Sequence, residues 1–143
     1  MFSTDDLEAV CRGEKELVDH GCILDLKDIP WASHQLWDND VQEKDGKYYM
    51  YFPAKDKTEI FRTGIAVADK PEGPFVPLKD PMHGSYSIDY AVFKDEDGKY
   101  YFYFGGIWGG QLQWYKDNKI SFNESGVAAP PPGDTEPIVP AKK

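Results

Sequence analysis

"EKDGKYYMYFPA" at residues 43–54 and "DEDGKYYFYFGG" at residues 95–106 are nearly the same stretch of sequence, and this repetition is the main evidence for the fold class. In each copy an Asp-Gly-Lys turn precedes an aromatic run, as expected for the second strand of a β-hairpin with aromatic side chains on both faces. The two turns are 52 residues apart, counted from Asp45 to Asp97. Repeats of about 40–50 residues are typical of propeller blades. The sequence therefore predicts an all-β fold, a partial β-propeller of four-stranded antiparallel blades.

The first strands of the two hairpins also correspond. "LWDNDVQEK" (36–44) precedes the first turn and "YSIDYAVFKDE" (86–96) the second, so Asp40 and Asp89 take equivalent places if the turns differ in length by three residues. Innermost strands of a propeller begin near its axis, and we expect both carboxylates to face one cavity. After the first hairpin, "TGIAVADKPEGPF" (63–75) predicts a third strand and a turn into the outer strand.

The two ends of the chain carry weaker signals. Residues 4–19 predict a short helix capped by Thr4 or Asp5. From residue 123 onward the chain is rich in Pro, Gly and Ala, which is typical of an extended segment. We expect a partial propeller over residues 1–122 and a Pro-rich tail over residues 123–143.

The charge balance limits the partners. A formal charge of −9 and a pI near 4.7 argue against nucleic acid and anionic membranes, which both require clustered Lys and Arg. A neutral ligand such as a sugar fits this balance, although acidity by itself also serves solubility.

Cysteine usage and the first residues bear on the compartment. Cys11 and Cys22 predict free thiols, with a single bridge as the alternative. Residues 1–20 hold no apolar run after a basic start, so no signal peptide or transmembrane segment is expected and a cytoplasmic location is the default.

Several segments together resemble the family 43 glycoside hydrolases. They are "STDDLEAV", "DHGCIL", "PWASHQLWDNDVQEKDGKYYMYF", "GIAVADKPEGPF", "YSIDYAVFKDEDGKYYFYFGG" and "WGGQL", in the family's order and spacing over residues 3–115. The resemblance implies a five-bladed β-propeller that removes xylose or arabinofuranose from plant polysaccharides with inversion. A propeller of this family has roughly 300 residues, so the chain is expected to hold the end of blade one and blades two and three.

The resemblance also implies a set of catalytic carboxylates. An inverting glycosidase requires a carboxylate that activates water and a carboxylic acid that protonates the leaving oxygen, and a third carboxylate nearby raises the pKa of that acid. The family's Ser-Ile-Asp-Pro motif matches residues 87–90 here, which makes Asp89 similar to the pKa-tuning Asp. The base and the acid are expected upstream and downstream of these residues, and turnover by these residues alone is not expected.

Two prolines of the family's motifs are replaced. Trp-Ala-Pro-Asp reads Trp37-Asp38-Asn39-Asp40, and Tyr90 stands where Pro follows the tuning Asp. Because proline fixes φ, we expect the backbone beside both carboxylates to be freer than in the family pattern.

Aromatic and amide side chains are candidates for holding a sugar. Trp37 and Trp108 adjoin motifs at the expected cavity end, whereas Trp31 and Trp114 are expected in packing. Asp40 and Gln111 are further candidates for substrate binding. Their alternatives are a carboxylate that accepts backbone N–H bonds for Asp40 and a solvated loop amide for Gln111.

No cofactor or metal is expected. "DEDG" (95–98) begins like a calcium loop but lacks the closing ligands, so it predicts a hairpin turn, and the three histidines show no metal spacing. The expected partner is a xylo- or arabino-configured saccharide. The alternatives are a non-catalytic carbohydrate-binding module and a homo-oligomer that forms through open blade edges.

Overall fold

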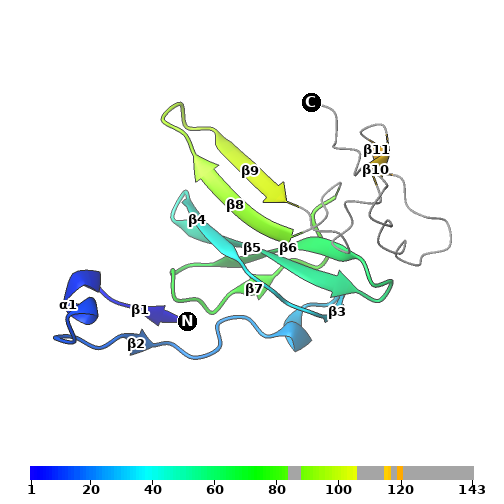
Figure 1. Cartoon of the computed structure of the whole chain (residues 1–143). Helices are drawn as coiled ribbons and strands as arrows, with labels where there is room; N and C mark the ends of the chain where they lie inside the picture. Colours follow the sequence, from blue (N-terminus) through cyan, green and yellow to red (C-terminus); the bar gives the residue numbers. More distant parts are fainter. Residues whose placement is uncertain (84–87, 106–114, 117–118, 121–143) are drawn as a thin grey trace, which may run out of the picture.

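The computed structural model describes residues 1–83, 88–105, 115–116 and 119–120 (Figure 1). Over this part the chain is mostly β, which confirms the predicted class. The elements in order are β1 (Phe2–Ser3), α1 (Leu7–Cys11), β2 (Val18–Asp19), the 3-10 turn η1 (Leu26–Asp28), β3 (Ala32–His34), β4 (Asp40–Lys44), β5 (Lys47–Asp56), β6 (Phe61–Ala68), β7 (Val76–Pro77), β8 (Ile88–Lys94), β9 (Tyr100–Gly105), β10 (Tyr115–Lys116) and β11 (Lys119–Ile120).

The largest sheet is one antiparallel blade. Strands β5, β6 and β7 follow one another across it, while β3 and β4 both pair with β5. β3 pairs with the last residues of β5, and β4 pairs with the first half of β5. β3 and β4 therefore form one interrupted inner strand. Gln35 lies in the interruption and has a φ of 54°. The predicted order of hairpin, third strand and outer strand is confirmed.

The two copies of the repeated motif use different turns. Asp45 and Gly46 have φ values of 53° and 75°, as a two-residue type I′ turn requires. The second turn holds one residue more, not three: the Asp95 N–H donates to the Lys99 carbonyl at 2.9 Å, and Gly98 takes the left-handed conformation at 81°. "DEDG" is therefore a hairpin turn, as predicted. Asp40 pairs with Tyr51 and Ala91 with the equivalent Tyr103, so the predicted equivalence of Asp40 and Asp89 was wrong by two residues.

The core of the blade is built by alternate residues of β5. Met50, Phe52 and Ala54 are buried with neighbours from β6 and from the segment that precedes β3. A Cβ on Gly64 would lie 2.1 Å from the Phe52 ring, so this close approach requires glycine. Trp31 stacks on Phe52 with ring centroids 6.1 Å apart, which confirms its predicted role in packing.

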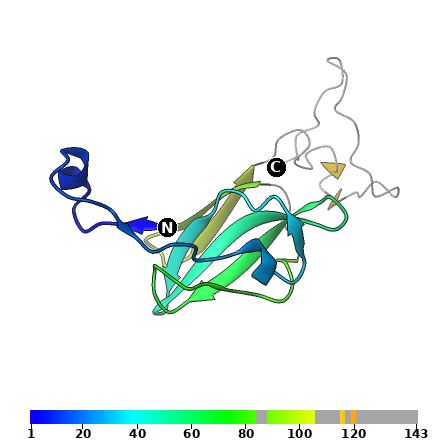
Figure 2. The same cartoon turned by 90° about the horizontal axis from the view of Figure 1, so that it is seen from below.

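The β8–β9 hairpin packs beside the β4–β5 hairpin, as both views show (Figures 1 and 2). Asp40 Oδ2 accepts the Val92 N–H at 2.6 Å, and Gln42 Nε2 donates to the Val92 carbonyl at 2.9 Å. The two hairpins also meet through the rings of Tyr51 on β5 and Phe102 on β9, whose centroids lie 5.3 Å apart. We refer to the two hydrogen bonds on Val92 as the Val92 clasp. The arrangement is that of consecutive propeller blades.

The opposite face of the second hairpin is exposed. Phe93, Tyr101 and Tyr103 are 53%, 39% and 58% exposed, whereas Tyr51, which the repeat makes equivalent to Tyr103, packs against the next hairpin. Whether copies of the chain associate through such surfaces stays a prediction.

The N-terminal residues form a small ribbon beside the sheets (Figure 2). β1 pairs with β2, and the helix between them is shorter than predicted. The predicted cap was wrong: Asp6 caps α1, because its carboxylate accepts the Ala9 N–H at 2.9 Å while the Thr4 hydroxyl accepts the Asp6 N–H. Within the described residues, no helix is long and apolar enough to cross a membrane.

The Val92 clasp yields a stability prediction. Hydrogen bonds to a charged partner contribute about 1.5–3 kcal/mol each, so Asp40→Ala is expected to lower the free energy of unfolding by about 2 kcal/mol. Denaturant titration measures this change. Asp38→Ala, at an exposed position two residues earlier, is the matched control and should change it by less than about 0.5 kcal/mol. Equal losses in both variants would show that the clasp contributes nothing specific.

Candidate functional site

Asp89 lies near the start of β8 in a strained backbone conformation. Its φ is 60°, and the pairing of β8 with β9 shifts register between Ile88 and Ala91, which marks a β-bulge. Left-handed backbone is unfavourable for most side chains but is tolerated by Asp. Because bulges re-aim side chains and occur often beside active sites, the exposed Asp89 side chain is the first candidate of the site.

The backbone of the facing strand leaves room for this carboxylate. A Cβ on Gly105 of β9 would come within 3.9 Å of Asp89 Oδ2, which is an ordinary contact distance. Ser87, which begins the matched motif, lies outside the described residues.

Asp40 takes a different role from Asp89. Its two carboxylate oxygens accept backbone N–H groups, Oδ1 from Val41 at 2.8 Å and Oδ2 from Val92 at 2.6 Å. These bonds correspond to the alternative in which Asp40 accepts backbone hydrogen bonds. Contact of Asp40 with a sugar stays a prediction.

Trp37 lies in the segment that connects β3 to β4 and presents a partly exposed aromatic ring. The centroid of its ring lies 4.6 Å from that of Phe61, with the two planes tilted by 49°, and the backbone N–H of Trp37 donates to the Pro53 carbonyl. Phe61 is buried, and 40% of Trp37 remains exposed. A half-exposed indole on a buried ring is rigid enough to stack against a sugar, so Trp37 keeps its place as a candidate.

The β5–β6 loop, at the same end of the blade as Trp37, is organised by Asp56. Asp56 Oδ1 accepts hydrogen bonds from the Thr58 N–H, the Thr58 hydroxyl and the Ile60 N–H, and Oδ2 pairs with Arg62 Nε at 3.0 Å. Burial favours a higher pKa for Asp56, but these hydrogen bonds outweigh it and hold the pKa below its ordinary value. The Asp-x-Thr spacing is a turn signal that sequence reasoning missed.

Tyr90, which the sequence marked only as the residue in place of a family proline, is a buried aromatic residue. The Tyr90 side chain is buried, and its ring centroid lies 5.3 Å from that of Phe102 and 6.5 Å from that of Phe104, both on β9. The backbone at this position is thus constrained by packing where proline would have constrained it covalently. Burial is the main reason that the pKa of the Tyr90 phenol lies far above its ordinary value.

Two candidates cannot be placed. Trp108 and Gln111 lie outside the described residues, as does Trp114, so their expected roles stay predictions. Across residues 1–83, 88–105 and the two short strands that follow, no group of three or more His, Cys, Asp or Glu side chains could hold a metal ion.

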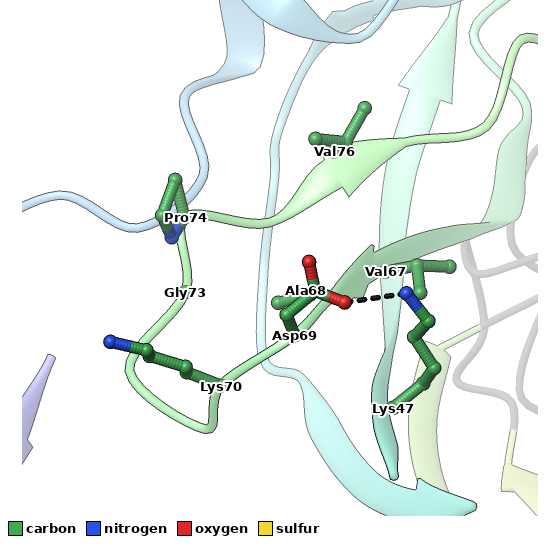
Figure 3. Close-up of a pocket in the computed structure, with 8 residues that line it drawn as sticks. All are labelled: Lys47, Val67, Ala68, Asp69, Lys70, Gly73, Pro74 and Val76. Atoms are coloured by element: carbon green, nitrogen blue, oxygen red, sulfur yellow. Dashed lines mark hydrogen bonds and ion pairs between the residues drawn. The ribbon is translucent and has the colours of Figure 1, made fainter. Parts of the chain in front are cut away.

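The cavity in Figure 3 is not part of this site. It has a volume of about 440 Å³ and lies between the first hairpin turn and the β6–β7 loop, where Lys47 and Asp69 form an exposed ion pair. Lys47 follows the turn that closes β4, whereas Asp40 begins that strand, so the cavity lies at the other end of the blade. A groove of about 290 Å³ lined by Tyr49, Tyr51 and Tyr100 runs between the two hairpins.

Consecutive antiparallel blades are the arrangement of a β-propeller, and comparison with known proteins gives the family. The family model described as "Glycosyl hydrolases family 43" matches residues 16–129, and the chain belongs to this family of O-glycosyl hydrolases.

Relatives in sequence are similar over most of the chain. A "Beta-xylosidase" of Xylanibacter ruminicola is 65% identical over 123 residues, which cover 83% of this chain and 39% of the relative. A "Xylosidase/arabinosidase" of Bacteroides ovatus is 58% identical over 138 residues, covering 96% of this chain and 40% of the relative. The chain thus spans about two fifths of the length of these relatives.

Solved structures agree with the partial propeller. The structure of "RS223-Beta-xylosidase" matches with a TM-score of 0.77 and 54% identity, covering 93% of this chain and 38% of that one. A GH43 β-xylosidase/α-arabinofuranosidase from a compost microbial metagenome, solved in complex with xylotriose, matches with a TM-score of 0.71 and 63% identity over 76% of this chain and 33% of that one.

The left-handed conformation of Asp89 makes a prediction about two substitutions. Asp89→Ala should be less stable than Asp89→Gly by about 1 kcal/mol, because alanine is strained at positive φ and glycine is not. Thermal or denaturant unfolding of both variants measures this difference. The same pair of substitutions at Asp95, which has no positive φ, should show no advantage for glycine. A more stable Ala variant at position 89 would contradict the bulge.

The lowered pKa of Asp56 predicts a dependence of stability on pH. A carboxylate whose pKa is depressed by folding stabilises the protein above its unfolded pKa of about 3.9 and loses that contribution as the pH falls through the folded value. Asp56→Asn should therefore be less stable than the parent chain at pH 7, and the difference should shrink toward pH 3. Unfolding titrations at both pH values measure it, and a difference that grows in acid would refute the assignment.

Proposed function

We propose that this chain is part of an inverting glycoside hydrolase that removes terminal xylose or arabinofuranose, and that Asp89 is its pKa-tuning carboxylate. The observation that carries the proposal is the bulge at Asp89, where a strained backbone presents an exposed carboxylate at the start of an inner strand. The matched motif at residues 87–90 and the names of the relatives support it.

The proposed role follows from electrostatics. In inversion, a general acid must stay protonated until it donates to the leaving oxygen, while a second carboxylate activates water on the other side of the sugar. An ionised Asp89 beside the acid favours the protonated form of that acid through like-charge repulsion. The base and the acid belong to other residues of the complete protein, because no motif in this chain matches either of them.

Trp37 provides the second part of the proposed site. Its ring packs on the buried Phe61 ring, and its backbone N–H is bonded to the Pro53 carbonyl, so both the main chain and the ring are positioned before a sugar ring stacks on it. The neutral ligand also agrees with the formal charge of −9, which disfavours anions. The solved complexes of family members with xylotriose support a xylo-configured ligand.

Two measurements test the proposal on the 143-residue chain. Calorimetric titration with xylotriose and with an arabino-oligosaccharide should show binding that Trp37→Ala removes. Tyr101→Ala is the matched control, because Tyr101 is 39% exposed against 40% for Trp37 but lies on the exposed face of the second hairpin. Nitrophenyl xyloside and arabinofuranoside should not be hydrolysed, since one tuning carboxylate cannot supply both base and acid.

Each measurement tests a different part of the proposed site. Binding that survives Trp37→Ala would remove Trp37 from the site. Rapid release of nitrophenol would show that this chain holds its own base and acid. Binding without turnover in the chain, followed by a loss of hydrolysis on Asp89→Asn in the complete protein, is the expected pair of results.

A further inference from the structure

The strained backbone of Asp89 needs a structural cause. An Asp at a φ of 60° within a strand persists only where the surroundings determine its conformation. The Asp89 side chain is exposed and cannot supply that constraint through its own packing. The constraint must therefore come from the residues on either side of it.

Both neighbours of Asp89 are anchored in the interior. Ile88 is 4% exposed and Tyr90 7%. The Tyr90 ring lies 5.3 Å from the Phe102 ring at an angle of 32° and 6.5 Å from the Phe104 ring in an edge-to-face arrangement. These are favourable aromatic geometries, so the peptide that follows Asp89 is fixed by a large buried side chain.

Tyr90 also links the bulge to the preceding blade. Its phenol lies close enough to the Thr63 hydroxyl of β6 for that hydroxyl to lower the pKa of the phenol, against the stronger effect of burial. Thr63 is fully buried, so this interaction with the phenol takes place away from water. The Asp89 carboxylate acts on the same phenol and raises its pKa further.

We propose that Tyr90 is a positioning residue, whose buried ring holds the bulge in the conformation that presents Asp89 at the end of the blade. The catalytic importance of Tyr90 rests on the proposed function of Asp89. The effect of Tyr90 on the backbone conformation of Asp89 does not depend on that function. Aromatic packing supplies the rigidity here. A proline in place of Tyr90 would instead bias Asp89 toward extended backbone with negative φ.

The aromatic ring and the hydroxyl of Tyr90 contribute separately. The contacts with Phe102 and Phe104 involve the ring alone, and they remain when Tyr90 is replaced by Phe. Replacement by Ala removes the ring and leaves the peptide after Asp89 without an anchor. The inference therefore distinguishes two variants at one position.

Nuclear magnetic resonance of the isotope-labelled 143-residue chain tests it. The scalar coupling between the amide and α protons of Asp89, with its backbone chemical shifts, reports φ at that residue. Tyr90→Phe should retain the left-handed values, and Tyr90→Ala should shift them toward those of an extended strand. Tyr51→Ala is the control: it removes a ring that packs on Phe102 from the other blade and should leave the values of Asp89 unchanged.

The outcomes separate this inference from the proposed function. Left-handed values that persist in a folded Tyr90→Ala chain would overturn the positioning role. If that variant does not fold, Tyr90→Leu, which keeps apolar volume without the aromatic ring, is judged by the same criterion. A failure of xylotriose binding in the parent chain would overturn the proposed function and leave the coupling result intact.

Discussion

The arrangement of the two hairpins depends on the Val92 clasp. Val92 lies on the edge of β8 that faces the first hairpin, and the peptide groups of an inner strand require partners once they leave water. Asp40 binds its N–H and Gln42 its carbonyl, both from β4. Because one residue is held at both of its backbone groups, the register between the hairpins is fixed. Asp89 is three positions before Val92 in the chain, so the register between the hairpins also sets where Asp89 lies.

Asp40 and Asp89, which both lie near the start of an inner strand, make different interactions. Asp40 uses both carboxylate oxygens on backbone amides and connects the blades, whereas Asp89 keeps its carboxylate exposed. The two positions also differ in their backbone: the pairing of β8 with β9 shifts register beside Asp89, whereas β4 pairs with β5 without a shift from Asp40 onward. The rings of Tyr51 and Tyr90 both pack on the Phe102 ring, so aromatic contacts connect the two hairpins that carry these aspartates.

The repeated strand predicted much of this fold. Period-2 alternation of aromatics and the Asp-Gly turns are local signals, and they correctly identified both hairpins, the third strand and the outer strand. The interrupted inner strand was not predicted, because the break at Gln35 depends on pairing with the distant end of β5. The helix cap was misplaced by one or two residues, since Thr4, Asp5 and Asp6 are all chemically able to cap and only the chain path selects among them.

By itself the sequence determined the fold class, the family and the position of the carboxylate in the matched motif, because strand period, turn chemistry and motif spacing are written in neighbouring residues. Tertiary structure decided what each carboxylate does. Asp40 binds an amide 52 positions away, and Asp89 is followed by a tyrosine that packs against the facing strand β9. Long-range contacts of this kind depend on which surfaces meet after folding, and no local pattern encodes them.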